Sequence, residues 1–269
     1  MITLDRDDGV RLHVEVSGFG PPLLALHGWS RSSADLGPLA DRLAGFRVLR
    51  PDLRGHGRST PGPFTLAALA ADLAALAEAE GLEDALLLGW SLGAQVALAA
   101  LAGHATLRAR VAGLVLLGAT PRFTEGDGWP HGLPARAVEG LALRVRRGPE
   151  KAVHRFLDDC FAPGELDAAG LARLEPLRGA RPPDPATALA GLELLASTDL
   201  RATLGGVPLP ALVLHGEADA ICPVGAGRAL AAALPRSRLL TFPGLGHAPL
   251  LSRPDGVAAA VSGFARALR

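Results

Sequence analysis

Short apolar runs alternate with alanine-rich stretches of helical period along most of the chain. The alanine-rich stretches predict helices over 66–79 and 92–101. Buried strands separated by such helices are typical of a mostly parallel sheet with helices on both faces. Residues 10–16 alternate between apolar and polar instead, which predicts an antiparallel edge hairpin with the first residues. The runs that predict strands are 23–26, 46–49, 85–88, 111–117, 211–214 and 237–242.

This rhythm stops between about Pro121 and Gly206 and resumes at Leu209. We therefore predict an α/β core made of residues 1–120 and 207–269, with a helical cap, or lid, of residues 121–206 inserted between two strands. A separate small domain is the less economical alternative, because the segment is short and interrupted. The interruptions are prolines at 130, 134, 149, 163, 176, 182 and 183.

Composition narrows the class of protein. The chain has 269 residues, 49% of them hydrophobic, which is enough for a full core, and it carries 27 basic and 27 acidic residues. Because these charges balance, the chain has no net positive charge that would favour binding to nucleic acid. The first fifteen residues are charged, and no apolar run reaches the ~18 residues of a membrane span. We expect a cytoplasmic monomer with no membrane or nucleic-acid partner.

The two cysteines, Cys160 and Cys222, lack the spacing of a metal site and are too few for a disulfide framework. No metal or other cofactor is expected.

The pentapeptide Gly89-Trp90-Ser91-Leu92-Gly93 joins the predicted strand 85–88 to the predicted helix 92–101. A serine between a strand and a helix, flanked by two glycines, is the nucleophile elbow, in which a strained turn exposes the hydroxyl. The glycines leave room for the neighbouring strand and helix. Ser91 is therefore the predicted nucleophile.

A serine nucleophile needs a histidine base and an acid that orients the base. Asp219 follows the strand 211–214, and His247 lies in the Gly/Pro-rich loop after the strand 237–242. The order serine, acid, histidine resembles that of the α/β-hydrolases. Asp219 is the preferred acid and His247 the base, although Glu217, Glu125 or Asp127 are alternative acids. His215, at a strand end beside a glycine, is predicted to be a packed structural residue.

The oxyanion hole is predicted to consist of two backbone N–H groups, those of Leu92 and Trp29. Trp29 follows the strand 23–26, and Gly28 would let this turn approach a substrate. The Trp29 ring either forms a wall of the acyl pocket or packs in the core. In the turn-rich segment 51–59, Asp52 and Arg54 are predicted to hold loops together and His56 to be exposed.

Basic residues cluster within the predicted cap. With only Glu150 among them, they would form a patch for an acidic partner if they share one face, and otherwise a solvated helix face. They are Arg144, Arg146, Arg147, Lys151 and Arg155. Apolar residues of the same segment would line the space beneath the cap or form its core; these are Phe156, Leu157, Phe161, Leu192, Leu194 and Leu195.

A more specific pattern combines the elbow with His27-Gly28-Trp29, the segments Thr120–Phe123 and Asp127–Pro130, and Gly191–Arg201. In these segments the chain resembles the pimeloyl-[acyl-carrier protein] methyl ester esterases of biotin synthesis. It implies an α/β-hydrolase fold and hydrolysis of the methyl ester of a pimeloyl chain on its acyl-carrier protein, which releases methanol.

The resemblance also implies roles for individual residues. Ser91, Asp219 and His247 would be catalytic, and Lys151 and Arg155 would contact the acidic carrier protein. Ala94 replaces a second glycine after the elbow, and the spacing beyond Phe161 differs, so Arg173 and Arg178 are not assigned. Substrate contacts would come from Trp29, Leu92, Phe156, Leu157, Asp158, Asp159 and Cys160, the last at a position where a polar amide is familiar.

Two other functions share these features. A generalist α/β-hydrolase, such as a short-chain esterase, a C–C bond hydrolase or a cofactor-free haloperoxidase, would have the same triad and a different cap. A ligand receptor of the same fold would bind without turnover.

Overall fold

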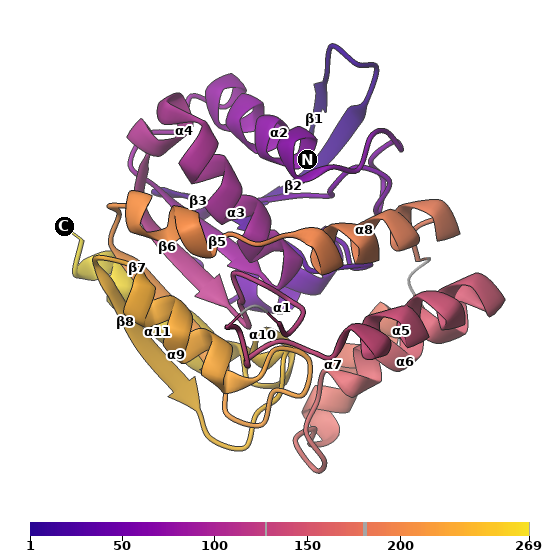
Figure 1. Ribbon diagram of the computed structural model, residues 1–269. Coiled ribbons are helices and arrows are strands. Elements are labelled where there is room, and N and C mark those ends of the chain that lie inside the picture. Colours follow the sequence, from indigo (N-terminus) through magenta and orange to yellow (C-terminus); the bar gives the residue numbers. More distant parts are fainter. Residues whose placement is uncertain (127, 180–181, 269) are drawn as a thin grey trace.

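A computed structural model describes residues 1–126, 128–179 and 182–268. The described strands form one sheet of eight, in the order β1-β2-β4-β3-β5-β6-β7-β8 (Figure 1). The pair β1/β2 is the predicted antiparallel hairpin, β2/β4 is also antiparallel, and every other pair is parallel, which confirms the mostly parallel sheet. The strands are β1 (Ile2–Asp5), β2 (Arg11–Ser17), β3 (Pro22–Leu26), β4 (Arg47–Pro51), β5 (Ala85–Trp90), β6 (Val111–Leu117), β7 (Ala211–Gly216) and β8 (Ser237–Phe242).

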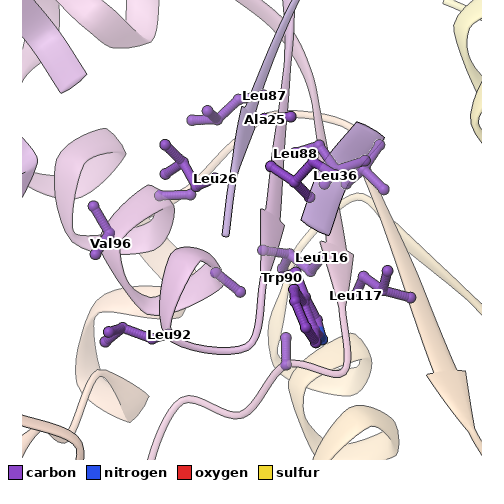
Figure 2. Close-up of a cluster of buried hydrophobic side chains, with 14 of the residues drawn as sticks. Ala25, Leu26, Leu36, Leu87, Leu88, Trp90, Leu92, Val96, Leu116 and Leu117 are labelled. Atoms are coloured by element: carbon purple, nitrogen blue, oxygen red, sulfur yellow. The ribbon is translucent and has the colours of Figure 1, made fainter. Parts of the chain in front are cut away.

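The central strands are buried on both faces. Every residue of β5 and β7 is buried, whereas β1 and β8 at the two edges alternate between partly buried and exposed residues. Helices therefore cover both faces of the sheet centre. Figure 2 shows part of this core on both faces of the sheet: Leu26 and Leu87 lie on the side of α3 (Leu92–Gly103), which contributes Leu92 and Val96, whereas Leu88 lies beside Leu36 on the other side.

The direction in which each crossover moves along the sheet determines which face of the sheet its helix covers. Crossovers between parallel strands are right-handed, and β3 to β4 runs in the opposite direction across the sheet from the later crossovers. The helix between β3 and β4, α1 (Gly37–Ala40), therefore lies on the face opposite α2, α3 and α9, and it contacts α10 and α11. The remaining helices of the core are α2 (Leu66–Ala79), α4 (Ala105–Ala109), α9 (Val224–Ala233), α10 (Pro249–Ser252) and α11 (Pro254–Arg266), with the 3₁₀ turn η1 (Ser33–Leu36); the 3₁₀ turn η2 (Arg201–Gly206), at the end of the connection between β6 and β7, packs against α3 and α9.

Residues 121–206, here called the cap segment, connect β6 to β7 and project beyond the sheet (Figure 1). The two ends of this segment meet: Leu200 N–H donates to the Pro121 carbonyl at 2.9 Å, and Arg122 pairs with Asp199 in an antiparallel bridge. The segment therefore leaves and rejoins the core at one point. Its helices are α5 (Ala135–Arg147), α6 (Pro149–Asp159), α7 (Ala168–Arg178) and α8 (Pro185–Ser197).

No helix in the described ranges is both long and apolar enough to span a bilayer.

Candidate active site

Ser91 occupies a strained turn between β5 and α3. Its φ of 56° and ψ of −117° lie in a region that L-residues rarely adopt. The flanking glycines are required by packing. A Cβ at Gly89 would lie 2.5 Å from the Ala94 Cα, and one at Gly93 would lie 2.6 Å from the Leu26 carbonyl oxygen. This backbone has the form of a nucleophile elbow.

The end of β6 lies beside the elbow and brings His247 close to it. Ser91 N–H donates to the Leu117 carbonyl at 3.0 Å, and the next residue, Gly118, lies against the His247 imidazole. A Cβ at Gly118 would be 3.0 Å from His247 Nδ1. On the other side, the Trp90 indole N–H donates to the His247 carbonyl at 3.0 Å. The two residues that contact His247 here are therefore both near Ser91: Trp90 precedes it in sequence, and Gly118 follows Leu117, its hydrogen-bond partner.

His247 and Asp219 form a buried pair. Nδ1 of His247 lies 2.8 Å from Oδ2 of Asp219, and the other carboxylate oxygen accepts the N–H groups of Ile221 and Cys222 at 2.8 Å each. Burial would raise the pKa of the Asp219 carboxyl, but the charge and hydrogen bonds of His247 and His215 outweigh burial and lower that pKa. Asp219 is thus held as a carboxylate that orients His247.

The opposite ring nitrogen of His247 has no such partner. Nε2 is buried, and within the described part of the chain it makes no hydrogen bond. With Nδ1–H committed to Asp219, Nε2 carries the lone pair that a general base needs.

Two of the three alternative acids lie elsewhere. Glu217 is exposed and accepts the Thr241 hydroxyl at 2.7 Å, and Glu125 is exposed in the cap segment. Asp127 lies outside the described residues. Of the four candidate acids, Asp219 is the one that the described contacts join to His247.

His215 is fully buried, as the sequence predicted. Its Nε2–H donates to the Cys222 carbonyl at 2.7 Å and lies 3.3 Å from Asp219 Oδ2. The residue therefore supports the turn that carries Asp219.

The Gly28 turn packs against the elbow. A Cβ at Gly28 would lie 3.3 Å from the Ser91 Cβ. His27 holds the orientation of this turn: its Nε2 accepts the Leu53 N–H at 3.0 Å, so the proton is on Nδ1, which donates to the Gly28 carbonyl at 2.8 Å. The N–H of Trp29 belongs to the same peptide and points the opposite way, because a trans peptide places C=O and N–H antiparallel. This role of His27 was not predicted, although its place at a strand end before Gly28 was a usable signal.

The Trp29 ring packs between cap helices. Its side chain is 1% exposed, its indole N–H donates to the Ala188 carbonyl at 2.8 Å, and its ring meets Phe156 edge to face at 4.8 Å. Of the two interpretations of this ring, these contacts favour packing, and they connect the predicted oxyanion turn to both α6 and α8.

The prediction that His56 is exposed was wrong. His56 is 1% exposed, because the segment 51–59 folds inward and places its ring 5.2 Å from that of His27. Burial, together with the neighbouring His27, lowers the pKa of His56 to about 3. The predicted anchors of this segment are confirmed: Asp52 accepts the Ser33 N–H at 2.7 Å, and Arg54 forms a buried ion pair with Asp72.

The stretch 156–160 divides between two environments. Phe156, Leu157 and Cys160 are buried, and burial also raises the pKa of the Cys160 thiol. Asp158 and Asp159 are exposed, where Asp158 accepts from Arg178. The buried three face the core of the molecule, and the two acids lie on the solvent side of α6.

Four of the five clustered basic residues line one surface hollow of about 270 Å³. Arg144 and Arg147 of α5 meet Lys151 and Arg155 of α6 there, and all four are exposed. Arg155 lies 4.0 Å from Asp159, while the other three have no ion pair with any described residue. Arg146 instead lines a separate groove of about 580 Å³ between α5 and α8.

Comparisons with known proteins agree with this architecture. Residues 23–260 match the profile of the alpha/beta hydrolase family. A protein of Nitrosomonas europaea named pimeloyl-[acyl-carrier protein] methyl ester esterase is 39% identical over 91% of this chain and 95% of its own length. A protein of the same name from Xylella fastidiosa is 36% identical over 94% and 98%. The solved structure of an esterase from Exiguobacterium antarcticum superposes with a TM-score of 0.91 at 24% identity, covering 98% of each chain.

Proposed function

The chain belongs to the alpha/beta hydrolase family and, within it, to the pimeloyl-[acyl-carrier protein] methyl ester esterases, and we propose that it performs their reaction in biotin synthesis. The substrate is the methyl ester of pimeloyl-[acyl-carrier protein], and the products are the free carboxylate on the carrier protein and methanol. The observation that carries the catalytic part of the proposal is the buried His247, paired with Asp219 through Nδ1 and with no hydrogen bond at Nε2 to any described residue.

Ser91, His247 and Asp219 act as nucleophile, base and orienting acid. As Ser91 Oγ bonds to the ester carbonyl carbon, its proton moves to His247 Nε2. The resulting oxyanion accepts hydrogen bonds from the N–H groups of Leu92 and Trp29. The bond to the methoxy group then breaks, and His247 gives its proton to the methoxy oxygen, which leaves as methanol.

Water completes the cycle. It attacks the acyl-serine carbonyl while His247 Nε2 takes its proton, and this proton returns to Ser91 Oγ when the acyl bond breaks. Each proton and bond is accounted for by the chain, the ester and water.

The remaining proposed roles concern substrate and partner. The cap segment acts as a lid, with Phe156, Leu157 and Cys160 toward the acyl chain; contacts from Asp158 and Asp159 remain predictions. The hollow that contains Lys151 and Arg155 binds the acidic carrier protein, supported by the absence of neutralising partners for three of its four cations among the described residues. The cytoplasmic location and monomeric state also remain predictions.

The deciding experiment compares kcat/KM for methyl pimeloyl-carrier protein with that for a free short-chain methyl ester, with Ser91→Ala as the blank. A strong preference for the carrier-bound ester is expected. Equal values for the two substrates would instead indicate a generalist esterase.

A further inference from the structure

Glu165 is a buried carboxylate in the loop between α6 and α7, and it joins the cap segment to the core. Glu165 is only 5% exposed. Oε2 accepts the N–H of Ala162 at 2.7 Å and that of Gly246 at 2.7 Å, and Oε1 accepts the Ser252 hydroxyl at 2.5 Å. One donor lies within the loop itself, and the other two lie more than eighty residues away in the core.

This carboxylate has no basic partner within the described residues. A buried charge is costly unless hydrogen bonds compensate it, and here neutral donors supply all the compensation that the described residues provide. Such an arrangement holds the donors firmly, because each would lose a charge-assisted bond if it moved away.

The donors held in this way include the backbone of the catalytic loop. Gly246 immediately precedes His247, whose own N–H donates to the Cys160 carbonyl at 2.7 Å. Two successive peptide N–H groups of the loop thus bind the cap segment, one through Glu165 and one through the end of α6. The loop and the cap segment lie so close together that a Cβ at Gly246 would collide with the Cys160 carbonyl oxygen.

We propose that Glu165 is a positioning residue for His247, which sets where Nε2 lies relative to Ser91 through the Gly246 N–H. The imidazole is oriented by Asp219, the carbonyl of His247 by Trp90, and the N–H side of the loop by the cap segment. The inference rests on the proposed role of His247 as base. It makes the cap segment part of the catalytic framework as well as a cover.

The test uses an activated ester, p-nitrophenyl acetate, so that it does not depend on the carrier-bound substrate. Glu165→Ala is expected to lower kcat by about 10- to 100-fold with KM changed less than twofold, because a displaced base affects the transition state and not ground-state binding. Glu165→Gln is expected to restore kcat to within about threefold, since its amide oxygen can accept from both N–H groups while its NH₂ donates to Ser252.

A double-mutant cycle distinguishes positioning from general support. If Glu165 acts through His247, then Glu165→Ala should cost nothing further in a His247→Ala background. Ser252→Ala is the matched control: it removes the hydrogen bond to the other carboxylate oxygen and should leave kcat within about twofold, because the Gly246 contact remains. Additive losses in the cycle, or equal losses for Ser252→Ala and Glu165→Ala, would overturn the inference.

Two further results keep the test decisive. Should Glu165→Ala fail to fold, Gly246→Ala displaces the same loop through its collision with Cys160, and it must show the same kcat loss and the same non-additivity with His247→Ala. Wild-type turnover by Ser91→Ala would overturn the proposed function and this inference together. Inactive Ser91→Ala and His247→Ala with an additive cycle would overturn the inference alone.

Discussion

Nδ1 of His247 and Oδ2 of Asp219 lie 2.8 Å apart, although 28 residues separate them in the sequence. Asp219 lies in the turn after β7 and His247 in the loop after β8, and the register of these parallel strands sets Gly216 opposite Phe242. The pairing of two strands therefore brings an acid and a base to the same edge of the sheet. Glu217 N–H, which donates to the Phe242 carbonyl at 3.0 Å, continues that register into the turn.

Asp219→Asn should lower kcat by about 10³- to 10⁴-fold, by analogy with the same change in a serine protease triad. The two backbone N–H groups at Oδ1 would keep the amide oxygen in place and turn its NH₂ toward His247, which would force the proton from Nδ1 to Nε2. Steady-state kinetics on a short-chain ester measure the loss. Glu217→Gln is the control, and a comparable loss in that variant would show that the acid was assigned to the wrong residue.

Ser91→Ala and Ser91→Gly should both abolish nearly all turnover, yet differ in stability. The backbone at Ser91 has a positive φ that costs a side chain about 1–3 kcal/mol and costs glycine little. The glycine variant is therefore expected to unfold at a higher denaturant concentration than the alanine variant. A less stable glycine variant would mean that the elbow is not strained.

His56 should make the protein less stable as the pH falls. Its folded-state pKa of about 3 lies below the unfolded value of ~6.5, so the unfolded chain binds the proton first. Stability from this residue is complete above pH ~6.5 and declines toward pH ~3, with a loss of about 2 kcal/mol at pH 5.

The measurement is urea unfolding of wild type and His56→Asn at pH 8 and pH 5. Asparagine keeps a donor for the Arg54 carbonyl, which His56 Nδ1 contacts at 2.9 Å, and it does not titrate. The stability difference between the two proteins should shrink by about 2 kcal/mol at the lower pH. An unchanged difference would show that His56 takes up its proton in the folded state.

Reversing the charge of Lys151 and Arg155 together should raise KM for the carrier-bound ester by about tenfold or more and weaken its dependence on salt. Values for a free short-chain ester should not change, because both side chains are exposed and line a surface hollow whose lining does not include Ser91. Arg238→Glu, on the exposed edge strand β8, is the control. An equal effect from Arg238→Glu would indicate that net charge, and not this hollow, attracts the carrier protein.

Features that depend on local pattern could be predicted from the sequence. The strands 111–117 and 237–242 and the helix 66–79 begin and end at the predicted residues, because burial imposes a period that the side chains display directly. Gly89 and Gly93, on either side of Ser91, were also informative. At each position a Cβ would collide with neighbouring backbone atoms, so the residue type alone indicated the close packing of the elbow.

The cap helices were harder to predict because a proline can either begin a helix or interrupt one. Pro149 was interpreted as an interruption, yet it occupies the first position of α6, where the missing N–H is not needed; Pro185 begins α8 in the same way. Pro176 lies inside α7. A proline's effect depends on its place in the helix, which the pattern alone did not show.

The burial of His56 and the contacts of Glu165 could not be predicted either, for a different reason. Both depend on segments that are distant in sequence, such as the loop at Gly246, which Glu165 reaches across 81 residues. Neither the turn-rich segment around His56 nor the Pro163-Gly164-Glu165 loop has a periodic pattern that reports what will pack against it.

The hydrogen bond that joins the two ends of the cap segment has a consequence for how this segment can vary. Pro121 and Leu200 share a hydrogen bond, so everything between them begins and ends at one place on the sheet. Changes in the length or sequence of the helices between these residues would leave the pairing of β6, β7 and β8 intact. The cap segment can therefore vary while the strands that carry Asp219 and His247 keep their register, provided that the new segment still supplies a hydrogen-bond acceptor for the loop at Gly246.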